Sequence, residues 1–247
     1  MEVQKRYILP LDDASVRDEV ERIAARERIS VLEASILYNR GLRAHLEIEE
    51  TMRISLDNMI DPRLMKDAMN AAKHILAAID AGEKICLYSD YDCDGFGAGV
   101  VGYEMMSKGL GADMFIFTNT RDMGYGMNKE DIDKLLAKHP DTKMIVTADN
   151  GVVAFEGVEY AKSLGLKVVI TDHHQPDVSG KLPDALAVVN PHRFDESYPY
   201  RQLCGTGVLW KVLSICYNLK GIPAKQANDL LDIVAVATVA DVVPITG

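Results

Sequence analysis

The sequence is poor in cysteine, and the cysteines that it has are not arranged to bind zinc. Its four cysteines (Cys86, Cys93, Cys204 and Cys216) form no CxxC pair and no group with histidine at zinc-ligand spacing. Cys86 lies in a strand-like apolar run and Cys216 in a helical one, so we expect both to be reduced thiols of the core. Cys93 lies between two aspartates, where we expect a small filler rather than a metal ligand.

Long hydrophobic runs and an excess of basic charge are also absent. No apolar run approaches the roughly 18–20 residues that span a bilayer. The first residues, MEVQKRYILPLDD, become acidic too early for a secretory signal. We therefore expect a cytoplasmic protein with no membrane partner. The formal net charge of −10 argues against a protein that coats duplex DNA, because the surface of such a protein is usually basic.

What the sequence does contain is a helical beginning followed by regular alternation of strands and helices. Residues 1–60 have helical patterns and no strand pattern, and Ser30 with Glu33 forms a capping box at one helix start. We therefore predict an N-terminal helical segment over 1–60 and a second domain over 61–247.

The second domain is predicted to have an α/β fold. Asp61 and Pro62 suit an N-cap and a first helical residue, and the apolar spacing after them predicts one helix through Ile79. Short apolar runs predict strands at 84–89, 112–118, 143–148, 167–171 and 186–190. Helices are expected at about 96–108, 128–139, 153–163, 206–219 and 224–237. Nearly continuous apolar strands that alternate with helices predict a parallel sheet of about five strands flanked by helices.

Acidic residues and histidines gather where the predicted strands end. The first strand is followed by the run SDYDCDG, the third by DNG and the fourth by DHH, and a further aspartate follows the apolar run VATVA. A single aspartate at a strand end is commonly a helix N-cap. Three aspartates within five residues, however, repel one another unless a cation compensates them. Ligands bind beyond the carboxyl ends of parallel strands, and carboxylates combined with imidazoles suit Mn²⁺ or Mg²⁺.

The motifs DYDCDG, TADNG, TDHH and VATVADVVP occur in this order and resemble the four motifs of the DHH phosphoesterase superfamily. The flanking segments ISVLEASILYNRG, GYGMN and LPDALAVVNPHR are similar to its RecJ branch of single-strand-specific 5′→3′ exonucleases. The resemblance covers about residues 30–244. Ser89 stands where RecJ proteins usually have glycine. Because the sequence ends at Gly247, we expect the DHHA1 domain and the OB-fold of such enzymes to be missing.

The resemblance implies two divalent cations, with Mn²⁺ preferred and Mg²⁺ as the alternative. It implies metal ligands at Asp90, Asp92, Asp94, Asp149, His173 and Asp241. It further implies that Asp149 bridges the ions and that Asp149, His173 and His174 are the catalytic residues. Asp172 is expected to orient a histidine from behind the ligands.

Four residues are candidates for substrate contacts: Arg121, Tyr125, His192 and Arg193. Arg121 is suited to a terminal 5′-phosphate, Tyr125 to stacking on a base, and His192 and Arg193 to backbone phosphates. A solvated surface charge is the alternative for each of the charged residues. Tyr91 and Phe96, two aromatic residues of the acidic loop, could also stack on bases, but we expect them to pack in the core.

Three functions remain open at this point. The first is a RecJ-like exonuclease of DNA repair and recombination that acts on single-stranded DNA, and the RecJ-like flanks favour it. The second is a phosphodiesterase of short oligonucleotides or small nucleotides. The third is a degenerate, non-catalytic DNA-replication module, against which the intact motifs argue. A single-strand-binding protein or another replisome protein is the expected protein partner. Without a second lobe, the chain is expected to bind single strands weakly.

Overall fold

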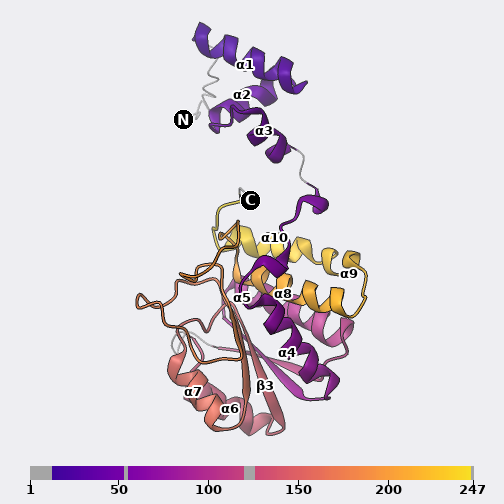
Figure 1. The fold of residues 1–247 in the computed structure, drawn as a ribbon, viewed down its shortest axis with the longest axis vertical. Coiled ribbons are helices and arrows are strands. Elements are labelled where there is room, and N and C mark those ends of the chain that lie inside the picture. The colour runs from indigo at the N-terminus through magenta and orange to yellow at the C-terminus, as the bar shows by residue number, and fades with distance from the viewer. Residues whose placement is uncertain (1–12, 53–54, 120–125, 246–247) are drawn as a thin grey trace, which may run out of the picture. The chain divides into compact units, whose positions relative to one another are not determined.

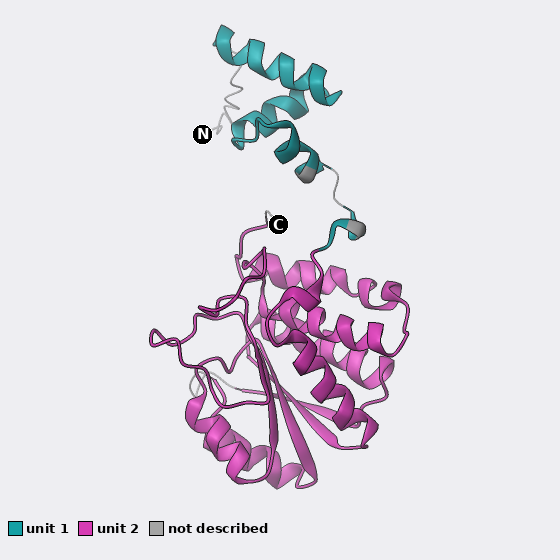
Figure 2. Cartoon of the chain, in the orientation of Figure 1, with its two compact units in different colours: residues 1–59, 246 teal, residues 60–245, 247 magenta. Residues whose placement is uncertain are grey.

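A computed structural model describes residues 13–52, 55–119 and 126–245 (Figure 1). The chain divides into two compact units, residues 1–59 with 246 and residues 60–245 with 247 (Figure 2). Each unit has an apolar cluster of its own. Among the described residues, no helix is both long enough and apolar enough to cross a bilayer.

The first unit consists of helices, as the sequence predicts. They are α1 (Ala14–Glu27), α2 (Val31–Asn39), α3 (His45–Met52) and the 3₁₀ turn η2 (Leu56–Asn58). The predicted capping box opens α2, since the Ser30 hydroxyl accepts from the Glu33 N–H at 3.2 Å and the Glu33 carboxylate accepts from the Ser30 N–H at 2.8 Å. Val20 and Leu37 belong to the apolar cluster that holds these helices together.

The second unit is built on a sheet of five strands, all paired in parallel. The strands are β1 (Lys84–Ser89), β2 (Met114–Thr118), β3 (Thr142–Ala148), β4 (Lys167–Thr171) and β5 (Ala187–Val189). Their order across the sheet is β2-β1-β3-β4-β5. The prediction of a parallel sheet of about five strands flanked by helices is confirmed.

Helices cover both faces of this sheet (Figure 1). They are α4 (Ala68–Asp80), α5 (Cys93–Gly102), the π-helical η4 (Tyr103–Gly109), α6 (Lys129–Lys138), α7 (Phe155–Ser163), α8 (Gly205–Leu219), α9 (Ala224–Asn228) and α10 (Leu231–Ala240). Cys86 and Tyr88 of β1 pack with α6 and α7 on one face. The next residue, Leu87, faces α5 on the other, because a Cβ on Gly102 would lie 2.3 Å from its side chain. Strand periodicity therefore places alternate residues in two cores.

Three helices differ from the sequence predictions. The predicted helix through Ile79 is broken into the 3₁₀ turn η3 (Pro62–Leu64) and α4, because Asp67 adopts a left-handed backbone with φ of 62°. The predicted helix over 224–237 is two helices, α9 and α10, separated by a turn. Helix α5 begins at Cys93 rather than Phe96, because the Asp92 carboxylate accepts from the Gly95 N–H at 2.9 Å and caps the helix.

The cysteines agree in part with expectation. Cys86 and Cys216 are free and buried, as predicted for core thiols. Cys93 is exposed, so the expectation of a small filler was wrong. Its position at the start of α5 turns its side chain outward, whereas Asp94 next to it is buried.

Candidate metal centre

The register of the sheet brings three acidic loops to one edge. Ser89 at the end of β1 lies beside Ala148 of β3, and Ala148 lies beside Thr171 of β4. Each of these three residues is followed directly by an aspartate. The carboxyl ends of the strands are therefore aligned closely enough for side chains that are far apart in the sequence to meet.

These side chains converge on His173. Its Nε2 atom lies 3.1 Å from Oδ1 of Asp149, 3.6 Å from Oδ2 of Asp241 and 3.7 Å from Oδ2 of Asp94. Three overlapping sets have ligand atoms that all lie within 4.8 Å of one another: Asp149, His173 and His174; Asp94, His173 and Asp241; and Asp90, Asp92 and Asp149. The six metal ligands implied by the resemblance, together with His174, thus lie in one group, which we call the acidic cluster.

Asp149 lies at the centre of the acidic cluster in an unusual conformation. It is 1% exposed, and its φ of 64° is in the left-handed region that few residues other than glycine adopt. Gly205 packs against it so closely that a Cβ on that glycine would lie 2.4 Å from Oδ1 of Asp149. Backbone strain of this kind is typical of functional sites.

Neither carboxylate oxygen of Asp149 accepts a hydrogen bond from the described residues, and Nε2 of His173 has no hydrogen-bond partner among them either. Burial, followed by the charge of Asp94, raises the pKa of Asp149 to about 10. Burial is also the main cause that raises the pKa values of Asp90 and Asp241. Within the described parts of the chain, no lysine or arginine forms an ion pair with this group.

The acidic cluster fits divalent cations. Buried polar atoms nearly always have a partner, and a carboxylate with two bare oxygens beside a bare imidazole nitrogen is the exception that a cation would remove. Carboxylate oxygens are hard ligands, and imidazole favours transition metals such as Mn²⁺. The donor set therefore suits divalent cations such as Mn²⁺ and Mg²⁺.

Asp172 differs from Asp149 because both of its carboxylate oxygens accept hydrogen bonds. Its Oδ1 atom accepts from Nδ1 of His174 at 2.8 Å and from two backbone N–H groups, and its Oδ2 atom accepts from the Val152 N–H at 2.8 Å. Burial favours the neutral form, but the His174 imidazole and these N–H groups outweigh it and hold the pKa of Asp172 below its ordinary value. Burial opposes protonation of His174, yet Asp172 outweighs it and raises the pKa of that imidazole.

Two aspartates of the acidic cluster also support the fold. Asp92 caps α5, so the ordinary N-cap role applies to it. Both oxygens of Asp94 accept backbone N–H groups at the start of α8, from Gly205 at 2.6 Å and from Thr206 at 2.8 Å. A carboxylate has about four lone-pair positions, so these bonds leave room for a cation.

Gly205 and Thr206 were not predicted as site residues from the sequence. These residues join α8 to the acidic cluster, since Thr206 also donates its hydroxyl to the Asp94 carbonyl at 2.7 Å. The segment CGTG before an apolar helix carried a signal, because glycines at a helix N-terminus expose N–H groups that bind anions. Here the anion is a carboxylate of the same chain.

The residues predicted to contact substrate differ in what the structure shows of them. Arg121 and Tyr125 lie outside the described residues. Nδ1 of His192 bonds to the His173 carbonyl, so this ring supports the loop that carries His173.

The contacts of Arg193 argue against the prediction that it binds backbone phosphates. Its guanidinium is buried and donates to the carboxylate of Asp67 at 2.7 Å, to both oxygens of Asp195 and to the Val188 carbonyl. A guanidinium that holds β5 to α4 in this way is a structural group rather than a phosphate ligand. A sequence pattern shows that an arginine is present but not which carboxylates surround it.

Comparison of this chain with known proteins identifies a family and several relatives. The family model "DHH family, N-terminal domain" matches residues 84–238. The single-stranded-DNA-specific exonuclease RecJ of Bacillus subtilis (strain 168) is 34% identical over 233 residues, which are 93% of this chain and 28% of that protein. The protein of the same name from Escherichia coli (strain K12) is 31% identical, over 84% of this chain and 36% of that protein.

Two solved RecJ structures also resemble this chain. A crystal structure of exonuclease RecJ bound to manganese superimposes with a TM-score of 0.66 and 28% identity, over 74% of this chain and 45% of that one. RecJ from Thermus thermophilus in complex with Mn²⁺ gives a TM-score of 0.70 at 24% identity, over 92% of this chain and 31% of that one, which shows a shared fold.

The chain spans about a third of the length of the curated relatives that it matches. Within that span the family model covers well over half of this sequence, and the parallel sheet carries the acidic cluster at its carboxyl edge. The chain therefore belongs to the DHH family.

Proposed function

We propose that this protein hydrolyses phosphodiester bonds of single-stranded DNA in the 5′→3′ direction with the help of divalent cations. The observation that carries the proposal is the state of Asp149, which is buried, has two oxygens without hydrogen bonds from the described residues, and lies 3.1 Å from His173. Such a carboxylate destabilises the fold unless something positive binds it. A centre that binds cations at a strand edge is also suited to attract an anionic phosphate.

Two cations, with Mn²⁺ preferred over Mg²⁺, would be held by Asp90, Asp92, Asp94, Asp149, His173 and Asp241. Asp149 would be the shared ligand, because it belongs to two of the three ligand sets and its carboxylate offers two oxygens, whereas His173, which also belongs to two sets, offers a single ring nitrogen. When bound, two such cations neutralise the phosphate and polarise its phosphorus–oxygen bonds for in-line displacement. The left-handed backbone at Asp149 and the close packing of Gly205 fix its carboxylate in place before substrate arrives.

His174 is the proposed group for proton transfer. Asp172 accepts from Nδ1 of His174, and this bond holds the proton on Nδ1 because the low pKa of Asp172 keeps that carboxylate ionised. Proton exchange with the substrate or with water would then take place at Nε2, as in other carboxylate–histidine pairs. Asp172 is a positioning residue in this proposal, and His173 acts as a ligand.

The choice of single-stranded DNA rests on the relatives and on sequence motifs. The curated relatives at 31–34% identity are single-stranded-DNA-specific exonucleases by name. Arg121 is proposed to pair with the terminal 5′-phosphate and Tyr125 to stack on a base, on sequence grounds alone. His192 could reach a phosphate only through the ring nitrogen that does not bond to His173.

The test is digestion of a single strand labelled at either end, in Mn²⁺, in Mg²⁺ and in EDTA. A 5′→3′ exonuclease releases labelled mononucleotide at once from the 5′-labelled strand and produces a shrinking ladder from the 3′-labelled strand. We expect faster hydrolysis in Mn²⁺ than in Mg²⁺ and none in EDTA. A 5′-labelled dinucleotide serves as the control for a small-nucleotide phosphodiesterase. Hydrolysis of the dinucleotide alone, or release that starts at the 3′ end, would contradict the proposal.

A further inference from the structure

An apolar cavity of about 370 Å³ is lined by residues that neighbour members of the acidic cluster in the sequence. It lies between α5 and the edge strand β2, and Ser89 and Phe96 are among the residues that line it. Ser89 directly precedes Asp90, and Phe96 follows Asp94 by two positions. The cavity therefore starts at the same carboxyl ends of strands at which the candidate metal ligands stand.

The wall of this cavity is a continuous exposed apolar surface. Phe96 was expected in the core, but it is 60% exposed, and Val100, Tyr103 and Ile116 are each more than 40% exposed. Phe96, Val100 and Tyr103 share one helical face, since they are four and three positions apart. Clustered exposed apolar side chains are a common mark of a binding site.

The polar end of the cavity consists of two hydroxyls. Ser89 and Thr118 lie at the ends of β1 and β2, and their side-chain oxygens are 3.1 Å apart. The one carboxylate in the lining, that of Glu104, pairs with Lys108 at 2.6 Å. The cavity is thus apolar along its length, carries hydrogen-bonding groups at the end nearest the acidic cluster, and holds no uncompensated negative charge.

We propose that this cavity is a nucleobase subsite in which the base of the nucleotide at the acidic cluster stacks on the ring of Phe96. This inference rests on the proposed function, which places a phosphate at the cluster. The volume matches a small planar ligand, whereas a partner helix needs a long groove with several anchor positions. Stacking on an aromatic ring accepts every base, which suits an enzyme that must digest any sequence.

Gly99 supplies the space for the base. It lies in the lining between Phe96 and Val100, and a Cβ at this position would meet only the Ile116 side chain, at 3.8 Å. That distance is an ordinary van der Waals contact. A larger residue at position 99 is therefore compatible with the helix and would occupy the cavity, so the glycine is explained by the need for room.

The test measures binding of a fluorescent hexathymidylate with phosphorothioate linkages, which resist hydrolysis, by anisotropy in Mn²⁺. A second strand carries abasic sites in place of every base. We expect the protein to prefer the base-bearing strand, and Phe96→Ala to weaken that binding by about 5-fold to 100-fold, the range of one stacking interaction. Affinity for the abasic strand should not change. Gly99→Met should give the same loss without lowering the melting temperature, since methionine is a better helix former than glycine.

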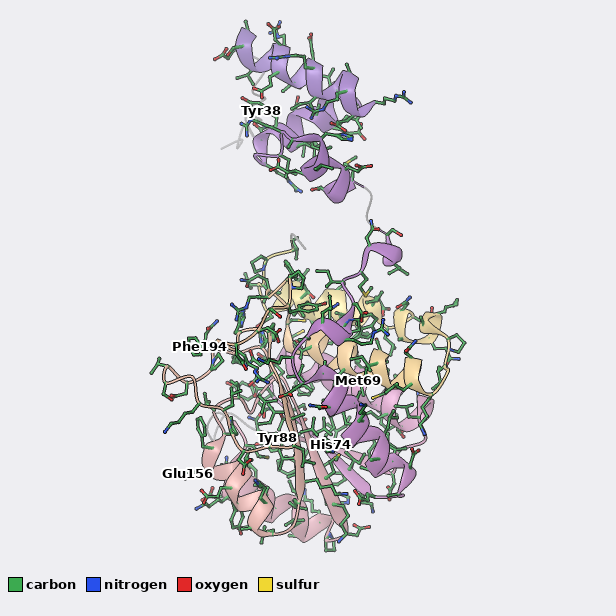
Figure 3. The ribbon with its side chains drawn as sticks, viewed as in Figure 1. Tyr38, Met69, His74, Tyr88, Glu156 and Phe194 are labelled. Atoms are coloured by element: carbon green, nitrogen blue, oxygen red, sulfur yellow. The ribbon has the colours of Figure 1, made fainter. Side chains whose placement is uncertain are left out.

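Phe194→Ala is the matched control, because Phe194 is 70% exposed and lies on the long loop after β5, outside the cavity lining (Figure 3). The inference is overturned if the protein binds both strands equally or neither, or if Phe194→Ala has the same effect as Phe96→Ala. It is also overturned if Phe96→Ala changes the oligomeric state instead of the affinity, because the surface would then be an interface. Base preference without Mn²⁺-dependent hydrolysis would leave this subsite standing and remove the proposed function.

Discussion

The two ends of the parallel sheet differ in whether their carboxylates form ion pairs with lysines. At the amino ends of the strands, Lys84 pairs with Asp141 at 2.7 Å and lies 3.8 Å from Asp113, and Lys167 pairs with Glu83 at 2.7 Å. Each carboxylate there has an ammonium group within reach, and the carboxylates of Asp113 and Asp141 are well exposed.

At the carboxyl ends the carboxylates lie close together, and three of them, those of Asp90, Asp94 and Asp149, are buried. Asp94 and Asp149 are each 1% exposed, and the ion-pair partners recorded for them within the described residues are histidines. The net charge of −10 alone does not explain this crowding, because the amino ends show that the chain can pair its acids. The lack of a countercharge is therefore specific to the carboxyl ends of the strands, where a cation is expected to supply it.

The largest expected effect is loss of hydrolysis when the central charge of the acidic cluster is removed. Asp149→Asn keeps the shape of the side chain and tolerates the left-handed backbone, which alanine does not. Removing the ligand that we propose two cations share should lower kcat by about a thousandfold, equivalent to several kcal/mol of lost charge stabilisation. Initial rates on a labelled single strand in Mn²⁺ provide the measurement.

Asp141→Asn is the control from the opposite end of the sheet, and it should leave the rate within about twofold. Equal losses in the two variants would mean that charge anywhere on the sheet affects hydrolysis. The comparison between the two ends would then have no functional meaning.

The second effect is stabilisation by Mn²⁺. At about 100 times its Kd, a ligand that binds only the folded state stabilises it by about 2.7 kcal/mol. For a domain of this size that corresponds to a rise in Tm of roughly 5–10 °C. Thermal unfolding with and without Mn²⁺ should show this rise in the protein and in Asp141→Asn, but not in Asp149→Asn. A rise that persists in Asp149→Asn would point to nonspecific ion binding.

The third effect concerns Lys211, a buried charge of α8 that does not belong to the acidic cluster. Lys211 is 7% exposed, and burial lowers its pKa to about 8. Between pH 8 and about 10.5 the unfolded chain binds more protons at this position than the folded chain, so stability should rise with pH across this window. Lys211→Met should remove that rise and increase the free energy of unfolding at pH 7 by about 1–3 kcal/mol. Urea unfolding at several pH values measures both quantities.

Lys211→Met also serves as a control for the second effect, because it removes a buried charge from outside the acidic cluster. The variant should keep the full Tm response to Mn²⁺. If it loses that response, the rise in Tm depends on buried charge elsewhere in the fold and is not specific to the acidic cluster.

The smallest effect is expected at the amino ends of the strands. Exposed ion pairs contribute about 0–1 kcal/mol, so Lys84→Met should change the free energy of unfolding by less than about 1 kcal/mol. Because salt screens such pairs, the change should be smaller at high ionic strength. Chemical denaturation at low and high ionic strength measures this change. A loss of several kcal/mol would show that the paired end stabilises the fold, and that the two ends differ less than their geometry suggests.

Much of the architecture could be predicted from the sequence because it depends on local patterns. The five strands, the capping box at Ser30 and Glu33, and the placement of acids directly after strands all follow from side-chain periodicity and from short-range hydrogen bonds. Because parallel strands end at a common edge, these local patterns also predicted that Asp149 and His173 lie close together.

The features that the sequence did not reveal depend on neighbours that are distant along the chain. Phe96 has the apolar character of a core residue, but its side chain is 60% exposed on a face of α5 that no other described element covers. Arg193 has the character of a phosphate ligand, but Asp67 and Asp195 surround it.

Which residues lie at the carboxyl edge could be predicted from the sequence alone, because strand direction and periodicity are local. Which of those acids accept hydrogen bonds from the rest of the chain became clear only from the folded structure. Asp172 receives donors from Val152 and His174, whereas Asp149 receives none from the described residues. The physical reason is that hydrogen bonds and burial depend on distances across the fold, which no stretch of sequence contains.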